Sequence, residues 1–176
     1  MSNIQSFAAD YSEARDKFLA AARLAGARTF RYDNPSKGPG GEPLSTDVAV
    51  VGPEDASKVV ATISSTHGVE GYCGSGFQVD WLATVGASGL PPDTAAVFVH
   101  AINPYGFAWT RRVTEEGNDL NRNYIDHGKP YPVNEGYLEI ADFLVPADLG
   151  EAGTKAADAK LAAYRNKVGD IAFFRA

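Results

Sequence analysis

Cysteine is almost absent from this sequence, since Cys73 is the only one among 176 residues. A single cysteine excludes an internal disulfide, which is typical of proteins from a reducing compartment. The first residues lack the basic start and apolar core of a secretory signal, so we expect a cytoplasmic protein. Long apolar runs are also missing, and none approaches the roughly 20 residues of a membrane span. We therefore expect no membrane partner.

Basic residues are outnumbered, with 16 Lys and Arg against 22 Asp and Glu and a net charge of −6. This balance argues against nucleic acid as a general partner, because phosphate binding needs a basic face. Histidine is scarce too, with only His67, His100 and His127 in the chain. The hydrophobic fraction of 44% is ordinary for a globular protein, and the length predicts one domain or one domain with an extension.

Hydrophobic periodicity predicts an order of helices and strands. The predicted elements are a helix from Asp10 to about Arg28, a loop at 34–43, strands at 47–52 and 58–64, a helix at 74–85 with Phe77 and Trp81 in the core, and a strand at 95–102. The second strand alternates little between apolar and polar residues, which suggests burial on both faces. Strand, helix and strand in that order form a crossover unit, so its two strands should be parallel. We therefore predict an α/β fold, a three-layer sandwich whose central sheet is mixed and mainly parallel and is flanked by helices.

The segment 103–132 is polar and has little periodicity, so it should be ordered mainly by its own polar contacts. Long ordered loops at strand ends are where functional sites tend to lie. After this segment the pattern becomes helical again, at 137–144 and from Gly153 or Thr154 to about Phe174.

His67 and Glu70 lie three residues apart among glycines, where a predicted strand gives way to a helix. Ligands of open α/β sheets bind beyond the carboxyl ends of the strands. An imidazole and a carboxylate on one tight turn can converge on one cation, and both suit zinc. The alternative is that His67 has only a structural role.

A second group of polar residues follows the third predicted strand. Asn103-Pro-Tyr-Gly106 is a turn signature, and Arg111, Arg112 and Arg122 bring three guanidinium groups close in sequence. Guanidinium binds carboxylates in bidentate fashion and stabilises developing oxyanions. The alternative is a solvated loop whose arginines pair with its own acidic residues.

Together the two groups resemble the zinc metallocarboxypeptidase superfamily, and more closely its uncharacterised bacterial branch related to acyl-amino-acid deacylases. The motifs that carry the resemblance are His-Gly-Val-Glu-Gly at 67–71, Asn-Pro-Tyr-Gly at 103–106 and Asp-Leu-Asn-Arg-Asn at 119–123. They occur in the family's order, and the resemblance covers about Thr46 to Arg165. It implies a single metallocarboxypeptidase-like α/β domain over 1–176, truncated at its C-terminal side.

The resemblance also implies roles for individual residues. His67 and Glu70 would be two of three zinc ligands, and Arg112 would polarise the scissile carbonyl, with Arg111 as the less favoured choice. Asn121 and Arg122 would hold the free carboxylate of a peptide or acyl-amino-acid substrate. The reaction would be attack of zinc-activated water on an amide carbonyl.

The chain departs from the family where the third ligand, a later histidine, and the catalytic glutamate should follow. The only later histidine, His127, lies five residues after Arg122 and does not match that position. His100, within the third predicted strand, fits a role in packing or a hydrogen bond to a residue that holds the metal. The sequence therefore resembles the N-terminal half of such a hydrolase, with an apolar sheet edge that Asp158 to Phe174 would cover in part.

For three other residues a chemical role is an alternative to a structural role. Cys73 has no partner to activate it as a nucleophile except His67, so we interpret it as a small buried residue. Trp109 and Tyr124 lie in the polar segment and could line a substrate pocket.

The function predicted is therefore a zinc-dependent hydrolase of the carboxypeptidase type that cleaves an amide bond next to a free carboxylate. The alternative is a non-catalytic module that binds carboxylates through Arg112, Asn121 and Arg122. A third reading is a fragment that needs a partner segment to complete its site, and a homo-oligomer is left open.

Overall fold

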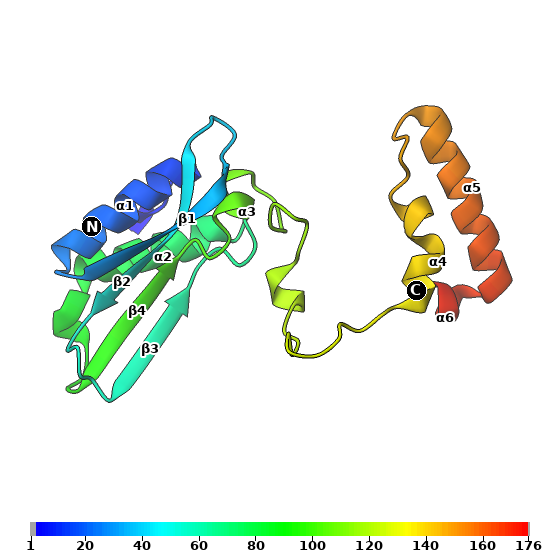
Figure 1. Cartoon of the computed structure of the whole chain (residues 1–176). Helices are drawn as coiled ribbons and strands as arrows, with labels where there is room; N and C mark the ends of the chain where they lie inside the picture. The colour runs from blue at the N-terminus through cyan, green and yellow to red at the C-terminus, as the bar shows by residue number, and fades with distance from the viewer. Residues whose placement is uncertain (1–2, 176) are drawn as a thin grey trace. The chain divides into compact units, whose positions relative to one another are not determined.

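The computed structural model describes residues 3–175, and the chain divides into two compact units, Met1–Tyr124 and Ile125–Ala176. The first unit contains the sheet, and the second is helical (Figure 1). In residues 3–175 no helix combines the length and the apolar character that crossing a membrane requires. The truncation of a larger domain and the cytoplasmic location stay predictions.

The first unit is built on a four-stranded mixed sheet, with helices packed against it. Its strands are β1 (Arg28–Lys37), β2 (Pro43–Val51), β3 (Lys58–Ile63) and β4 (Thr94–His100), in the order β1-β2-β4-β3. β3 and β4 are parallel, as the crossover predicts, while β1–β2 and β2–β4 are antiparallel. The predicted α/β fold with a mixed sheet is confirmed, but the expectation of a mainly parallel sheet is wrong, because two of the three strand pairings are antiparallel.

Two expectations about the strands are wrong. The segment predicted as a loop at 34–43 contains the end of β1, which pairs with β2 as far as Lys37 and Pro43 across an irregularity after Asn34. Pairing with β2 satisfies the backbone there even though the residues are turn formers. β3 is not buried on both faces, since all six of its residues are exposed; it is the edge strand of the sheet and pairs only with β4.

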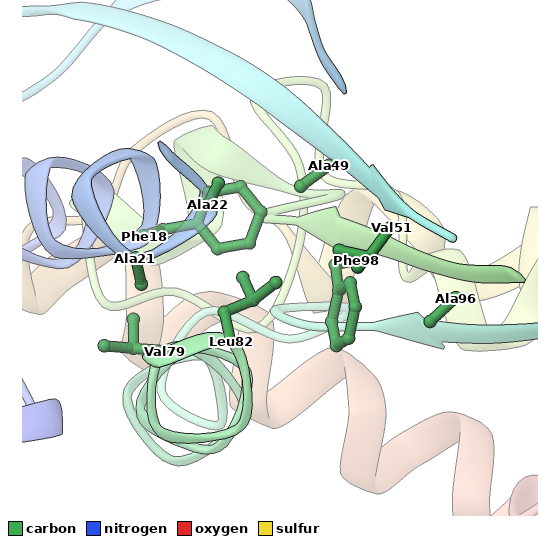
Figure 2. Close-up of a cluster of buried hydrophobic side chains, with 9 residues drawn as sticks. All are labelled: Phe18, Ala21, Ala22, Ala49, Val51, Val79, Leu82, Ala96 and Phe98. Atoms are coloured by element: carbon green, nitrogen blue, oxygen red, sulfur yellow. The ribbon is translucent and has the colours of Figure 1, made fainter. Parts of the chain in front are cut away.

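The main core lies between the sheet and two helices, α1 (Tyr11–Leu24) and α2 (Gly71–Thr84). Figure 2 shows Phe18 of α1 and Leu82 of α2 directed toward Ala49 and Phe98 of the sheet. Side chains of β2 and β4 point alternately to the two faces of the sheet, so every second residue faces the helices and contributes to this core. Phe77, expected in the core, is 71% exposed, whereas Trp81 packs against the core next to Phe98.

A polar cluster is buried beside this core. Asp47 of β2 is 2% exposed and accepts two hydrogen bonds from the Arg15 guanidinium, at 2.6 and 3.1 Å. His100 is fully buried, stacks on Phe18, and its Nε2 lies 2.9 Å from Ser75 Oγ. Burial lowers the pKa of His100 to about 4, so this imidazole is neutral at pH 7.

The second unit is a helical hairpin with a short third helix. It consists of α4 (Glu135–Leu144), α5 (Glu151–Val168) and α6 (Asp170–Phe173). The two helices expected in this region are thus present, and α5 ends where Gly169 adopts a φ of 82°. Short turns complete the chain, namely η1 (Asn3–Ser6), η2 (Gly86–Gly89), α3 (Pro104–Ala108) and η3 (Leu120–Arg122).

Candidate functional site

The site begins where β3 and β4 end side by side. Ser65, just after β3, has a φ of 61°, which turns the chain away from the sheet. The segment after β4 is tied to this turn, because Ile102 N donates to Ser64 O at 3.0 Å and Asn103 N donates to Ser65 O at 3.2 Å. The two loops that carry the predicted motifs therefore leave the sheet at the same edge, as their parallel strands require.

His67 and Glu70 face each other across the turn between β3 and α2. Gly71 N donates to Gly68 O at 3.0 Å, and Glu70 is the residue before the first turn of α2. His67 Nδ1 lies 3.0 Å from Glu70 Oε1. The His67 side chain is 9% exposed and that of Glu70 is 66% exposed. The imidazole is thus fixed inside the loop, while the carboxylate lies at the surface.

Asp119 contacts the opposite edge of the same imidazole. Its Oδ1 lies 3.0 Å from His67 Nε2 and also accepts a hydrogen bond from Asn121 N at 2.9 Å. Its Oδ2 accepts a hydrogen bond from Arg112 Nε at 2.9 Å. The side chains Glu70, His67, Asp119 and Arg112 therefore form one continuous polar row.

This row shifts the protonation of its members. The pKa of His67 is raised, first by its hydrogen bond to Glu70 and then by that to Asp119. The pKa of Asp119 falls to about 2, chiefly through the hydrogen bond to His67 and with further help from Arg112 and Asn121 N. Asp119 is therefore ionised at neutral pH, and its Oδ1 accepts a hydrogen bond from the Nε2–H group of His67.

The loop after β4 braces the loop that carries His67. Asn103 is 2% exposed, and its Oδ1 accepts from Gly106 N at the start of α3. Gly68 N donates to Arg111 O at 2.9 Å. A Cβ on Gly68 would lie 1.8 Å from Gly106 O and 2.4 Å from Arg111 O, so the two backbones meet where only glycine fits.

Asn121 and Arg122 lie in η3, immediately after Asp119. Both residues are exposed, and Arg122 Nη1 donates to Asn121 O at 3.1 Å. In residues 3–175 no hydrogen bond joins the Arg122 guanidinium to His67 or Glu70. The structure thus joins Arg112 to the histidine row directly, whereas the side chains of Asn121 and Arg122 are presented to solvent beside it.

Two side chains of the row have the donor atoms that a metal ion binds, Nδ1 of His67 and the carboxylate of Glu70. In residues 3–175 there is no group of three or more His, Cys, Asp or Glu side chains arranged to hold one ion. Two donors do converge, since His67 Nδ1 and Glu70 Oε1 are 3.0 Å apart. Two tetrahedral ligands of one zinc, each at about 2.1 Å, would be about 3.4 Å apart. A small opening of this pair would admit the ion, so the residues fit two of the three expected protein ligands.

Within residues 3–175 the other candidate residues make no hydrogen bond to Glu70, His67, Asp119 or Arg112. His100, the last residue of β4, is buried against Phe18 of α1, and His127 belongs to the second unit, is exposed and has its Nδ1 3.5 Å from Tyr131 OH. Cys73 is exposed, so its predicted burial is wrong. Trp109 is 41% exposed and donates to Lys37 O, and Tyr124 is 84% exposed. That Trp109 and Tyr124 line a substrate pocket stays a prediction.

The sequence reasoning missed Asp119 as the partner of His67, and Asn103 and Gly68 as the braces between the loops. A signal for Asp119 existed, because it begins the Asp-Leu-Asn-Arg-Asn motif that supplied Asn121 and Arg122. The pairing of Asp119 with His67 spans 52 residues of sequence. The local sequence around His67 or around Asp119 does not indicate that these two side chains meet.

Comparisons with known proteins find a distant likeness in fold. The chain is similar to a Fimbriiglobus ruber glutaminyl cyclase structure at 12% identity and a TM-score of 0.37, covering 50% of this chain and 36% of that one. Two Porphyromonas gingivalis glutaminyl cyclase structures give 21% and 18% identity and TM-scores of 0.34 and 0.36. They cover 52% and 66% of this chain, and 37% and 48% of theirs. The chain therefore spans less than half the length of each of these proteins.

No curated protein matches the sequence. A family of proteins does match, over nearly the whole chain and across both of its compact units. Residues 7–176, which include all three motifs around the candidate site, match the family described as "Protein of unknown function (DUF2817)", and the chain belongs to that family.

Proposed function

We propose that this protein is a zinc-dependent hydrolase of the carboxypeptidase type, which cleaves an amide bond next to a free carboxylate. The substrate would be the C-terminus of a peptide or an acyl amino acid. The observation that carries the proposal is the row in which His67 lies between Glu70 at 3.0 Å and Asp119 at 3.0 Å. Histidine ligands of zinc commonly donate their second N–H to a carboxylate in this way.

The two carboxylates differ in a manner that favours separate roles. Glu70 is 66% exposed, so its oxygen can turn from the imidazole to a cation that arrives from solvent. Asp119 is 17% exposed and accepts hydrogen bonds from His67, Asn121 N and Arg112. Asp119 would hold the proton of His67 at Nε2, which leaves the Nδ1 lone pair directed toward Glu70. His67 and Glu70 would then be the zinc ligands.

A zinc ion held by these two residues would supply an activated water and a Lewis acid for the amide carbonyl. Asn121 and Arg122 would bind the substrate carboxylate, because an amide N–H₂ and a guanidinium are suitable donors and both side chains are exposed beside Asp119. Arg112 uses its Nε for Asp119, and its terminal nitrogens would stabilise the oxyanion of the reacting carbonyl.

A non-catalytic carboxylate-binding module is the second candidate. One observation favours it, since in residues 3–175 only two potential zinc donors converge and a catalytic zinc needs three protein ligands with an open position. In this case Arg112, Asn121 and Arg122 would bind the same carboxylate without cleavage.

Zinc binding separates the two functions. The purified protein is titrated with Zn²⁺ against a competing chelator, alongside His67→Ala and Glu70→Gln. His127→Ala serves as the matched control, because His127 is an exposed histidine whose Nδ1 lies next to Tyr131 OH. The hydrolase predicts one bound zinc that both site variants lose and the control retains.

Carboxylate binding is measured in parallel, with N-acetyl amino acids as probes and Arg122→Gln as the site variant. Zinc-dependent release of the free amino acid supports the hydrolase. If the protein takes up no zinc at micromolar supply and still binds the acyl amino acids, the hydrolase is wrong and the binding module is correct.

A further inference from the structure

Arg112 is in an unusual position for a residue whose expected partner is a substrate. Its Nε donates to Asp119 Oδ2 at 2.9 Å, and the other oxygen of that carboxylate is the one that contacts His67 Nε2. The two oxygens of Asp119 are therefore divided between the guanidinium and the imidazole. Any rotation of the carboxylate that released Arg112 would also move the acceptor away from His67.

The backbone next to Arg112 is held equally firmly. Arg111 N donates to Gly106 O at 2.8 Å, and Arg111 O accepts from Gly68 N at 2.9 Å. The residue before Arg112 is thus hydrogen-bonded to the residue after His67. This bracket fixes where the Arg112 side chain begins, so its guanidinium reaches Asp119 from a defined point.

We propose that Arg112 is a positioning residue for His67, which acts by holding the Asp119 carboxylate in the orientation that accepts the Nε2 proton. The inference rests on the proposed function in one respect, namely that Nδ1 of the oriented imidazole is a metal donor. This role of Arg112 differs from contact with a substrate carbonyl, because Arg112 holds Asp119 before any substrate is bound.

Geometry and charge predict opposite effects when Arg112 is removed. The positive charge of Arg112 lies on the other side of the Asp119 carboxylate from His67, so it disfavours a second cation beside this imidazole. Loss of that charge alone would strengthen zinc binding. Loss of a carboxylate that orients a ligating histidine weakens it, because such outer partners commonly contribute 10- to 100-fold in affinity.

The experiment compares Arg112→Gln with Arg111→Gln in the full chain. Arg111 is the adjacent arginine, and its guanidinium has no hydrogen bond or ion pair within residues 3–175, so its variant removes the same charge without touching Asp119. Zinc affinity is measured by chelator competition. We expect Arg112→Gln to weaken zinc binding by about three- to tenfold, which is less than for Asp119 itself because Arg112 is one contact further from the imidazole. Arg111→Gln should leave binding unchanged or slightly tighter.

A second measurement needs no metal. The exchange of the His67 Nε2 proton is followed by NMR in the metal-free protein, and Arg112→Gln should speed it several-fold while Arg111→Gln does not. Zinc binding and proton exchange that are equal in the two variants would overturn the inference. If the wild type binds no zinc, the proposed function fails, and unchanged exchange in Arg112→Gln would then overturn the positioning role separately.

Discussion

Gly68 is the position where the geometry makes its strongest demand on the sequence. It follows His67, and a Cβ built on it would lie 1.8 Å from Gly106 O, 2.2 Å from Gly106 C and 2.4 Å from Arg111 O. Real Cβ atoms essentially never approach such neighbours within 3.0 Å. All three atoms belong to the backbone, so no side-chain rotation can relieve the contact. Gly68→Ala must therefore push the two loops apart.

The expected cost follows from two contributions. Separating the loops by about 1 Å is overpacking at a site that cannot relax, which costs about 3 kcal/mol. The hydrogen bond from Gly68 N to Arg111 O would be lost as well, at about 1 kcal/mol. Together they represent a large part of the 5–15 kcal/mol that typically stabilises a domain. For a unit of this size the melting temperature should fall by about 10–15 °C.

The assay is thermal unfolding followed by circular dichroism, with Gly40→Ala as the matched control. A Cβ on Gly40 meets only the end of the Glu42 side chain, at 3.0 Å, and Gly40 is exposed. The control should change stability by less than about 0.5 kcal/mol. A Gly68→Ala protein that melts within 3 °C or so of the wild type would refute the close approach of these two loops.

Three further predictions concern other residues of the first unit. The pKa of His100 is lowered to about 4 by burial, so its contribution to stability is complete above pH 6.5 and is lost as the pH falls toward 4. Denaturant unfolding of the wild type minus that of His100→Leu should show a loss of about 3 kcal/mol across this window, and a flat difference would contradict the burial. Arg15→Met leaves the Asp47 carboxylate buried without its partner and should cost about 3 kcal/mol in urea unfolding, whereas Arg31→Met, in an exposed ion pair, should cost less than about 0.5. Asp119→Ala should weaken zinc binding by about 10- to 100-fold in the chelator assay, and equal affinity would remove Asp119 from the site.

The sequence predicted those parts of the fold that depend on local periodicity. The helix that begins after Asp10, the crossover between β3 and β4 and the two C-terminal helices each contain a repeating apolar pattern. β1 has no such pattern, because its residues are mostly exposed and its end contains Asn34 and a proline. It is a strand because it pairs with β2 from Arg28 to Asn34 and again at Lys37. β2 follows after only the residues 38–42, so the partner is close in sequence, but the pattern of β1 itself gives no sign of the pairing.

The burial of individual residues was predicted less well than the elements. Helical spacing placed Phe77 on the same face as Trp81, yet Phe77 is 71% exposed. Periodicity identifies an apolar face of a helix but not the width of the surface that covers it. In the same way, a strand rich in apolar residues such as β3 is compatible with burial on both faces, yet all six of its residues are exposed at the edge of the sheet.

In the site, too, the contact between residues close in sequence could be predicted and the contact between distant residues could not. The distant contact depends on Gly68, which is why Gly68 is tested first. The contact of His67 with Glu70 could be foreseen, because three residues on a tight turn bring the side chains together. The contact of His67 with Asp119 spans 52 residues and requires the loop after β4 to lie against the turn at Gly68. That approach depends on an atom that is missing, the Cβ of Gly68. Gly68 is therefore the residue that permits this long-range contact. Its role cannot be recognised from the sequence, because the backbone that it contacts, at Gly106 and Arg111, lies far away along the chain.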